Sequence, residues 1–385
     1  MNAFQFTTVP HLIAETGAAA KLGPLLAERF PSARSALLVT DSGFVRTGLL
    51  AAPIASLEHH GIAVHTYADV VADPPEAVVL DAVARARAVK ADLIIGFGGG
   101  SSMDVAKLIA VLAASDQEIA AVYGISNVKG TRLPLVQIPT TAGTGSEVTN
   151  IAIVTTGATI KTGVVAPQLY ADLAILDASL TLGLPALATA ATGIDAMVHA
   201  IEAFTSRHKK NPMSDVLAKQ ALQLLSTNLV IACERGDHLA ARQAMLVGAC
   251  LAGQAFSNAP VAAVHALAYP IGGIFHVAHG LSNSLVLPHV LRFNVSHATS
   301  AYAELAAIVA PHASGSEEAR ADALIVAMQQ IAVRTGIATR LAQVGIGEHD
   351  LDRLADDAMK QTRLLGNNPR DMTWQDARAI YQAAW

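Results

Sequence analysis

The sequence contains little charge. Charged residues make up 15% of its 385 residues and hydrophobic residues 52%, with a formal net charge of −5. This composition is typical of a well-buried globular enzyme and not of a disordered chain. A net negative chain offers no electrostatic basis for binding nucleic acid. The one basic cluster, at residues 207–210, lies beside Asn211 and Pro212 and indicates a solvent-exposed loop.

Cysteine is also scarce, and targeting signals are absent from the sequence. Cys233 and Cys250 form neither a disulfide framework nor a zinc–thiolate spacing, so we expect reduced core residues of a cytoplasmic protein. The first six residues lack the basic and apolar regions of a signal peptide. The longest apolar stretch, residues 259–275, is interrupted by His265 and Pro270 and predicts a buried helix, with no membrane partner.

The length favours two domains, and the pattern changes near residue 183. Upstream, short apolar runs alternate with helical patterns. The expected strands are at residues 35–40, 61–67, 92–96 and 133–138, and the expected helices at 75–90 and 104–114. This alternation predicts a Rossmann-like α/β domain with a parallel sheet over residues 1–183. Residues 184–385 show helical periodicity almost throughout, which predicts an all-α domain.

Glycines dominate residues 96–104 (GFGGGSSMD), at an expected strand-to-helix turn. Positions without side chains let the backbone N–H groups of Gly98, Gly99 and Gly100 approach a pyrophosphate, and the helix N-terminus adds partial positive charge. Ser101 or Ser102 can cap that helix. The dinucleotide fingerprint G-x-G-x-x-G is absent, so the alternative interpretation is a tight turn.

Two further segments are candidates for contact with a nucleotide. Residues 139–149 (PTTAGTGSEVT) are dense in hydroxyls and glycines and suit a ribose, a phosphate or a nicotinamide amide, or else form a polar loop with a cap at Ser146. Asp41 follows a strand, where an acid accepts hydrogen bonds from an adenosine ribose and repels the 2′-phosphate of NADP. The alternative for Asp41 is a helix N-cap.

A carboxylate and several imidazoles form another pattern. Asp195 and His199 are four residues apart, so one helix face presents both. The run from Gln243 to Leu291 has no Asp, Glu, Lys or Arg but contains four histidines, and buried imidazoles need partners. Adding His265 and His279 to the first pair gives one oxygen and three nitrogen ligands, a set that suits Fe(II) or Zn(II). Ordinary hydrogen-bonded core histidines, or a closed structural metal site, are the alternatives.

The metal hypothesis requires a break in the chain. On one straight helix, His265 and His279 would lie about 21 Å apart, too far to share an ion. We expect the first helix to end at Pro270, Gly272 and Gly273 and the next helix to begin near His279.

Taken together, these segments match a family. The motifs GGGSSMD (98–104), PTTAGTGSE (139–147), ATGIDAMVH (191–199), HALAYP (265–270) and HG (279–280) stand in order. With this spacing the chain resembles the iron-dependent (group III) alcohol dehydrogenases essentially from end to end. The resemblance implies a dehydroquinate synthase-like arrangement, with an N-terminal NAD-binding domain, a C-terminal helical metal domain and a homodimer.

The resemblance also implies roles for individual residues. Asp195, His199, His265 and His279 would bind Fe(II), with Zn(II) as the alternative metal. NAD would be the cofactor, with NADP disfavoured. The predicted cofactor contacts are Asp41, Asp73, Gly98, Gly99, Gly100, Ser101, Asp104, Thr140, Thr141, Thr144, Thr149 and Lys161.

Two positions depart from the family pattern. Asp73 precedes Pro74 where family members often carry Asn-Pro, and a second acid near the adenosine would further disfavour NADP. Tyr269 stands where some members have a histidine four residues after the third metal ligand. His276 is then the nearest substitute for a proton relay, with Tyr269 second, unless His276 is simply an exposed loop residue.

The expected reaction interconverts a small alcohol, diol or hydroxy acid and its aldehyde or ketone, with hydride passing to the nicotinamide. A hydroxyacid–oxoacid transhydrogenase or a maleylacetate reductase on the same scaffold is the alternative enzyme. Dehydroquinate synthase and glycerol dehydrogenase share the architecture, but the four-ligand set argues against glycerol dehydrogenase. A metal-binding scaffold protein without catalysis is the alternative outside enzymes.

Overall fold

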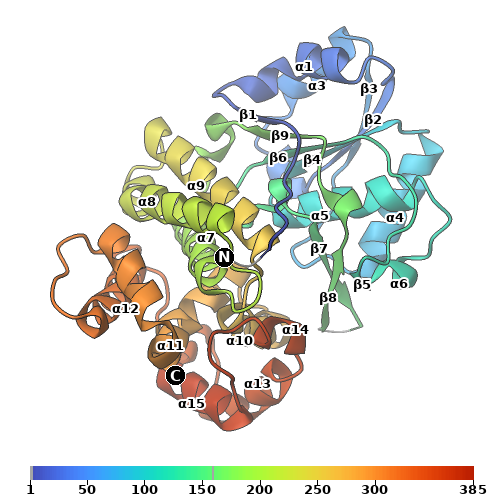
Figure 1. The fold of residues 1–385 in the computed structure, drawn as a ribbon. Coiled ribbons are helices and arrows are strands. Elements are labelled where there is room, and N and C mark those ends of the chain that lie inside the picture. Colours follow the sequence, from blue (N-terminus) through green and yellow to red (C-terminus); the bar gives the residue numbers. More distant parts are fainter. Residues whose placement is uncertain (1–2, 158–159) are drawn as a thin grey trace. The chain divides into compact units, whose positions relative to one another are not determined.

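A computed structural model describes residues 3–157 and 160–385 (Figure 1). The chain forms two compact units. Of the described residues, 8–141, 145–157 and 160–182 form an α/β unit, and 3–7, 142–144 and 183–385 form a helical unit. The expected division at residue 183 did not anticipate that the first residues and segment 142–144 belong with the helices.

A six-stranded parallel sheet forms the centre of the α/β unit (Figure 1). Its strands lie in the order β1 (Leu12–Ala14), β9 (Leu173–Leu176), β6 (Leu135–Pro139), β4 (Leu93–Gly98), β2 (Ser35–Val39) and β3 (Ala63–Tyr67). Every residue of β4, β6 and β9 is buried, as expected for parallel strands covered on both faces. The predicted parallel α/β fold is confirmed.

Helices connect these strands. They are α1 (Leu22–Arg29), α2 (Ser42–Val45), α3 (Ala51–His59), α4 (Glu76–Ala88), α5 (Gly100–Leu112) and α6 (Ile119–Val122), with 3-10 turns at Ala18–Lys21, Ser146–Val148, Pro167–Leu169 and Ala178–Thr181. The predicted helix at 75–90 corresponds to α4. The helix predicted to begin at residue 104 begins four residues earlier, at Gly100, because the glycine-rich segment itself forms its first turn.

A small second sheet was not predicted. It contains β5 (Gly124–Ile125), β8 (Ile160–Val165) and β7 (Ile151–Thr156), and β7 and β8 pair in antiparallel register. Strand β7 follows directly after the hydroxyl-rich loop, so this sheet determines where that loop ends. The β-branched residues of β7 and β8 were the available signal for it.

The helical unit is built on α7. Its helices are α7 (Ala186–Thr205), α8 (Pro212–Glu234), α9 (Leu239–Asn258), α10 (Ala263–Phe275), α11 (His279–Val309), α12 (Glu317–Arg334), α13 (Leu351–Ala358), α14 (Thr362–Leu365) and α15 (Trp374–Ala384), with 3-10 turns at Leu341–Val344 and Glu348–Asp350. Helix α7 packs against α8, α9 and α11, and α10 packs against α11. Fifteen of its side chains are buried, so it is the core helix of this unit. The predicted all-α character is confirmed.

Helix α8 is long and apolar enough to cross a membrane by length and composition, and 39% of its most apolar window is buried. The pair α9 and α10 meets the same test only jointly, across a bend of 108°. Core helices of globular proteins pass such a test as well. In this structure α8 packs along α7 and α9.

The break between the two histidine-bearing segments is not where the sequence indicated. Helix α10 continues through Pro270 and both glycines to Phe275, and it ends at His276 in the left-handed conformation, with φ 56°. The next helix begins at His279. Proline removes one helical hydrogen bond, but packing on the buried face of α10 holds the helix together beyond it.

Helix α11 approaches α7 closely at its first turn. A Cβ atom on Gly280 would lie 2.3 Å from the carbonyl oxygen of Ala191 and 3.2 Å from the Cβ atom of Asp195. The obstacle is main chain and cannot rotate away. Only glycine therefore allows α11 to begin at this distance from α7.

We expect Gly280→Ala to lower the free energy of unfolding by about 1–3 kcal/mol, the usual cost of overpacking a core. Urea denaturation of the two proteins measures the difference. Gly183→Ala is the matched control, because a Cβ atom there meets no atom within 4 Å among the described residues. A Gly280→Ala protein as stable as this control would contradict the close packing described here.

Candidate functional site

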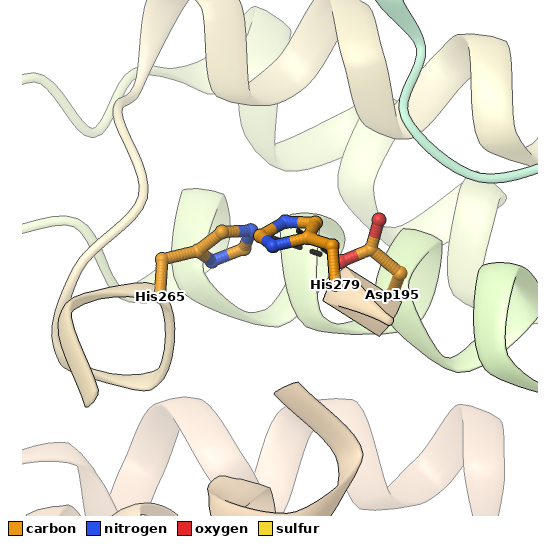
Figure 2. Close-up of side chains that lie close together, drawn as sticks. All are labelled: Asp195, His265 and His279. Carbon is orange, nitrogen blue, oxygen red and sulfur yellow. Dashed lines mark ion pairs between the residues drawn. The ribbon is translucent and has the colours of Figure 1, made fainter. Parts of the chain in front are cut away.

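Three side chains of the helical unit converge on one point. Asp195 lies on α7, His265 in the first turn of α10, and His279 is the first residue of α11. Figure 2 shows the three side chains pointing toward one another from these separate helices. The short connection from His276 to Ala278 separates α10 from α11 and allows the two histidines to meet.

The distances suit a metal ion. Oδ1 of Asp195 lies 3.6 Å from Nε2 of His279 and 3.8 Å from Nε2 of His265. One ligand atom from each of the three lies within 4.8 Å of the others. Bonds of the length typical for zinc place tetrahedral ligand atoms about 3.4 Å apart, so only a small contraction is needed. The donor set and spacing therefore fit a divalent transition metal.

The fourth predicted ligand lies beside this group. His199 is one helical turn after Asp195, and its ring stacks on that of His265 with centroids 4.8 Å apart. On its other side lies Phe256, at 4.3 Å. His199 is thus next to the cluster of three ligand atoms but is not one of its members.

The burial of this group controls its protonation. Asp195 is 2% exposed and His199 4%. Burial lowers the pKa of His199 to about 3, against the opposing effect of Asp195, so the imidazole is neutral at pH 7. Burial alone would raise the pKa of Asp195, but the three surrounding histidines hold it below its ordinary value. A carboxylate with neutral imidazoles is the state that binds metals.

Asn283 is a neighbour that the sequence argument missed. It lies four residues after His279 on α11, and its Nδ2 atom donates to Oδ1 of Asp195 at 2.6 Å. The same nitrogen lies 3.3 Å from Nε2 of His265 and 3.3 Å from Nε2 of His279. An amide nitrogen carries two hydrogens and one is donated to Asp195, so the second is left for the two Nε2 atoms. The spacing from His279 was the available signal.

Glu202 was also missed. It is 3% exposed and lies on α7, three residues after His199. Its Oε2 atom is 2.7 Å from Nδ1 of His265. Its seven-residue spacing from Asp195, which puts both carboxylates on one face, was the signal in the sequence.

The two residues predicted as proton relays differ in their surroundings. Tyr269 is half-buried, and its ring centroid lies 6.0 Å from that of His279. His276 is exposed, at the left-handed end of α10. Both therefore belong to the same unit as the metal candidates, and their role stays a prediction.

Some of the predicted nucleotide contacts follow the carboxyl ends of strands in the parallel sheet. The chain runs from β2 to β3 on one side and then to β4 on the other, so the strand order reverses between β2 and β4. Ligands of open α/β sheets bind at such a reversal, outside the carboxyl ends of the strands. Asp41 follows β2, and the glycine-rich segment follows β4.

The first turn of α5, with its backbone N–H groups, lies directly after strand β4 at this edge of the sheet. Gly99 is the N-cap and makes no side-chain capping bond, so the prediction that Ser101 or Ser102 caps this helix is wrong. Both serines instead lie within the first turn. The side-chain-free start at Gly98, Gly99 and Gly100 leaves the N–H groups of the helix N-terminus accessible, which favours an anion there.

The two carboxylate oxygens of Asp41 have different surroundings. Its Oδ1 atom accepts the N–H of Phe44 at 2.8 Å and caps α2, one of the two interpretations of the sequence. Its Oδ2 atom is turned to the glycine segment, 3.8 Å from where a Cβ atom on Gly98 would lie. Capping therefore leaves one oxygen at the sheet edge, so the two interpretations are compatible.

Lys107 was missed by the sequence argument, yet it anchors the hydroxyl-rich loop. Its fully buried ammonium donates to Oγ of Ser146 at 2.7 Å, Oγ1 of Thr149 at 3.0 Å and the carbonyl of Ile151 at 2.7 Å. Burial lowers the pKa of Lys107, and Asp104, 3.5 Å away, opposes this shift. Thr149, a predicted cofactor contact, is therefore held by α5.

Asp104, another predicted contact, belongs to this network. Its Oδ1 atom accepts from Oγ of Ser146 at 2.6 Å, and its Oδ2 atom accepts from the N–H of Ile153 at 2.9 Å. Both oxygens thus bind protein groups, and in the structure Asp104 positions the loop and the start of β7.

The remaining predicted contacts lie in three places. Thr140 and Thr141 follow β6 in the α/β unit, and the main chain of Thr140 donates to the carbonyl of Gly98 at 2.9 Å. Thr144 lies in segment 142–144, which packs with the helical unit. Lys161 and Asp73 form an ion pair, with Asp73 in the left-handed conformation at φ 53°. These two predicted cofactor contacts therefore compensate each other's charge.

Comparisons with known proteins agree over both units. A family model described as iron-containing alcohol dehydrogenase matches residues 10–178. A second, described as the C-terminal part of the Fe-containing alcohol dehydrogenase family, matches residues 189–385.

Individual relatives extend over nearly the whole chain. It is 43% identical over 360 residues to long-chain-alcohol dehydrogenase 1 of Geobacillus thermodenitrificans strain NG80-2, covering 92% of this chain and 90% of that protein. It is 34% identical over 381 residues to the NAD-dependent methanol dehydrogenase of Bacillus methanolicus, covering 98% and 99%. The crystal structure of a 1,3-propanediol oxidoreductase matches with a TM-score of 0.96 and 32% identity, covering 100% of both chains.

The Lys107 network predicts a large effect of a single substitution. We expect Lys107→Met to lower the free energy of unfolding by about 3 kcal/mol or more, because it leaves Asp104 without its buried cation. We also expect faster hydrogen exchange across residues 146–153. Lys21→Met, which removes an exposed lysine of the same unit, should change stability by less than about 0.5 kcal/mol. Equal stability of the two variants would contradict an anchoring role for Lys107.

Proposed function

Because the chain belongs to the iron-containing alcohol dehydrogenase family, we propose that it catalyses the NAD-dependent interconversion of a small alcohol and its aldehyde or ketone. The observation that carries the proposal is the convergence of Asp195, His265 and His279. The names of relatives support an alcohol or a diol as substrate.

The helical unit would hold the metal through Asp195, His265 and His279, with His199 as the fourth ligand. When bound, the metal supplies Lewis-acid polarisation of the alcohol or carbonyl oxygen. The ring of His199 is kept neutral by burial, and the hydrogen bond from Asn283 helps to hold the pKa of Asp195 below its ordinary value. These residues thus keep the site ready to bind a cation at neutral pH.

The α/β unit would bind NAD at the edge where the strand order reverses. The first turn of α5 suits the pyrophosphate, and the Oδ2 atom of Asp41 suits the hydroxyls of the adenosine ribose. A negative charge at Asp41 disfavours the extra phosphate of NADP. Asp73 contributes less to this discrimination, because Lys161 compensates its charge.

For proton transfer we propose the two residues predicted from the sequence, His276 and Tyr269. His276 is exposed and can exchange protons with water, and Tyr269 lies beside the ring of His279. We assign His276 as the first candidate and Tyr269 as the second. The expected homodimer and cytoplasmic location stay predictions.

Removing a ligand tests the metal assignment. We expect purified His265→Ala to retain less than about a tenth of the wild-type metal content, and its kcat/KM for alcohol oxidation to fall about a thousandfold or more, because metal polarisation contributes several kcal/mol. Elemental analysis and NAD reduction measure the two effects. His297→Ala, which removes an exposed histidine on α11, is the matched control and should behave as wild type.

An active, metal-replete His265→Ala protein would refute the assignment. Following NADH absorbance with a single alcohol also separates a dehydrogenase from a transhydrogenase. A transhydrogenase keeps its nucleotide bound and gives no net NADH from one substrate.

Charge at the sheet edge predicts the choice of nucleotide. Serine at position 41 keeps the N-cap of α2 but removes the carboxylate. We therefore expect Asp41→Ser to lower the ratio of kcat/KM for NAD to that for NADP by about tenfold, because a like charge no longer faces the 2′-phosphate. Steady-state kinetics with each nucleotide measures this ratio.

The control is Glu28→Gln, which changes net charge equally at an exposed position of α1. An unchanged ratio in Asp41→Ser, or the same shift in both variants, would remove Asp41 from the nucleotide site.

A further inference from the structure

We propose that Glu202 is a positioning residue of the metal site: it docks the first turn of α10 on α7 and fixes His265 in the tautomer whose Nε2 atom is free to bind metal. The proposal rests on the metal-dependent function proposed above. Glu202 contacts Nδ1 of His265, the ring nitrogen that would not bind the metal, so Glu202 itself would not be a ligand.

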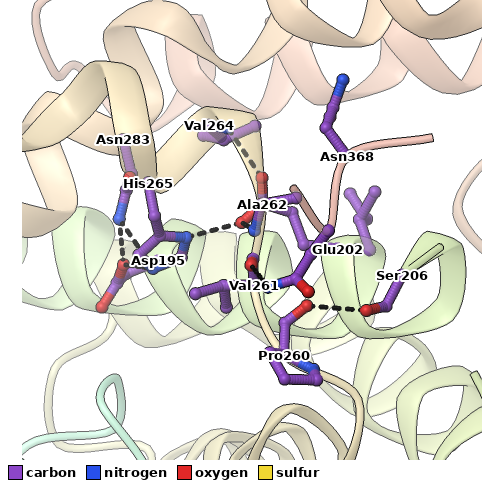
Figure 3. A network of polar contacts seen from close by, with 12 residues as sticks. Asp195, Glu202, Ser206, Pro260, Val261, Ala262, Val264, His265, Asn283 and Asn368 are labelled. Carbon is purple, nitrogen blue, oxygen red and sulfur yellow. Dashed lines mark hydrogen bonds and ion pairs between the residues drawn. The ribbon is translucent and has the colours of Figure 1, made fainter. Parts of the chain in front are cut away.

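The carboxylate of Glu202 binds three donors of the same short segment (Figure 3). Its Oε1 atom accepts the N–H of Val264 at 2.7 Å, and its Oε2 atom accepts the N–H of Ala262 at 2.9 Å. Oε2 also lies 2.7 Å from Nδ1 of His265. One buried side chain thus holds both the main chain around the ligand and the ligand ring itself.

These contacts determine where His265 carries its proton. A backbone N–H can only donate, so the two main-chain bonds make both oxygens of Glu202 acceptors. As a carboxylate, Glu202 has no hydrogen to donate, so the ring nitrogen beside Oε2 donates, which places the imidazole proton on Nδ1. A neutral imidazole with a proton on Nδ1 has a bare Nε2.

The opposite side of the ring is compatible with this tautomer. Nδ2 of Asn283 donates one hydrogen to Oδ1 of Asp195 and lies 3.3 Å from Nε2 of His265, so its second hydrogen can point to a bare Nε2. Glu202 and Asn283 come from different helices, α7 and α11. The contact with Glu202 therefore selects the tautomer, and Nε2 then faces the group formed by Asn283 and Asp195, 3.8 Å from Oδ1 of Asp195.

The position of Glu202 on α7 links all the ligands. It lies one turn beyond His199 and two turns beyond Asp195, on the same face of the helix. The N-terminus of α10 carries partial positive charge, so a carboxylate is the group suited to dock it. The third ligand is thereby positioned relative to the helix that carries the first two. Such carboxylate–histidine pairs behind a metal typically affect affinity by about 10- to 100-fold.

If Glu202 only held the segment in place, it would not control the tautomer of His265. A comparison with Ser206 distinguishes these two roles of Glu202. Ser206 is the C-cap of α7, four residues after Glu202; it is buried and donates to the carbonyl of Pro260 at 2.9 Å (Figure 3). It holds the same segment through the main chain alone, whereas Glu202 also binds the ring. Ser206→Ala should therefore loosen the segment and leave the tautomer of His265 unchanged.

The first measurement needs no substitution at Glu202. Metal-free wild-type protein with ¹⁵N-labelled histidine is studied by NMR, and the His265 signals are identified by their loss in His265→Ala. We expect a protonated Nδ1 and an unprotonated Nε2. A proton on Nε2 overturns the proposal, whether or not any Glu202 variant folds.

The second measurement compares Glu202→Gln with Ser206→Ala. Glutamine keeps the shape but replaces one acceptor oxygen with a donor, so it cannot accept from Ala262, Val264 and His265 together. We expect Glu202→Gln to bind Zn²⁺ and Fe²⁺ about 10- to 100-fold more weakly in competition with a chelator, with part of His265 protonated on Nε2. Ser206→Ala should lie within about threefold of wild type.

Wild-type metal affinity in Glu202→Gln overturns the proposal, and so does an equal loss of affinity in both variants. A wild-type protein that binds neither metal contradicts the proposed function instead. The tautomer measurement on metal-free protein distinguishes these two failures, because it does not depend on metal binding.

Discussion

The close contact between the start of α11 and α7 is the constraint on which the metal site depends. Gly280 lies against the main chain of Ala191, one turn before Asp195. This distance brings His279 to Oδ1 of Asp195 at 3.6 Å. Any side chain at position 280 would separate the helices, and with them the ligands. The short connection at residues 276–278 then allows His265 of α10 to lie beside His279 of α11.

The sequence predicted the proposed metal ligands but not the residues that hold the functional segments in place. The spacing of Asp195 and His199, together with histidines in an uncharged run, was sufficient to propose the ligand set, because both signals are local. Glu202 and Lys107 were missed because their importance lies in distant partners: His265 is 63 residues from Glu202, and Ile151 is 44 residues from Lys107. Local pattern also failed at Pro270, where tertiary packing overrides a helix-breaking signal.

The α/β unit shows the same dependence on buried ionic groups. Lys107 on α5 links the helix that offers its N-terminus to the loop before β7. Helix α5 and the end of the hydroxyl-rich loop, from Ser146 to Ile151, are therefore held together through Lys107. The strand prediction succeeded for β2, β3, β4 and β6. It missed β1 and the fully buried β9 of the same sheet, and it missed the β7–β8 hairpin, whose residues are only partly buried.

Charge balance gives a reason for two carboxylates on one face of α7. A divalent cation held by Asp195 and three neutral imidazoles would leave one net positive charge in a buried site, which is costly without compensation. The carboxylate of Glu202 supplies the missing negative charge one ring away, across His265. Its own desolvation is offset by two backbone N–H groups at a helix N-terminus. A second acid bound directly to the metal would achieve the same neutrality but would take a coordination position that the substrate oxygen needs.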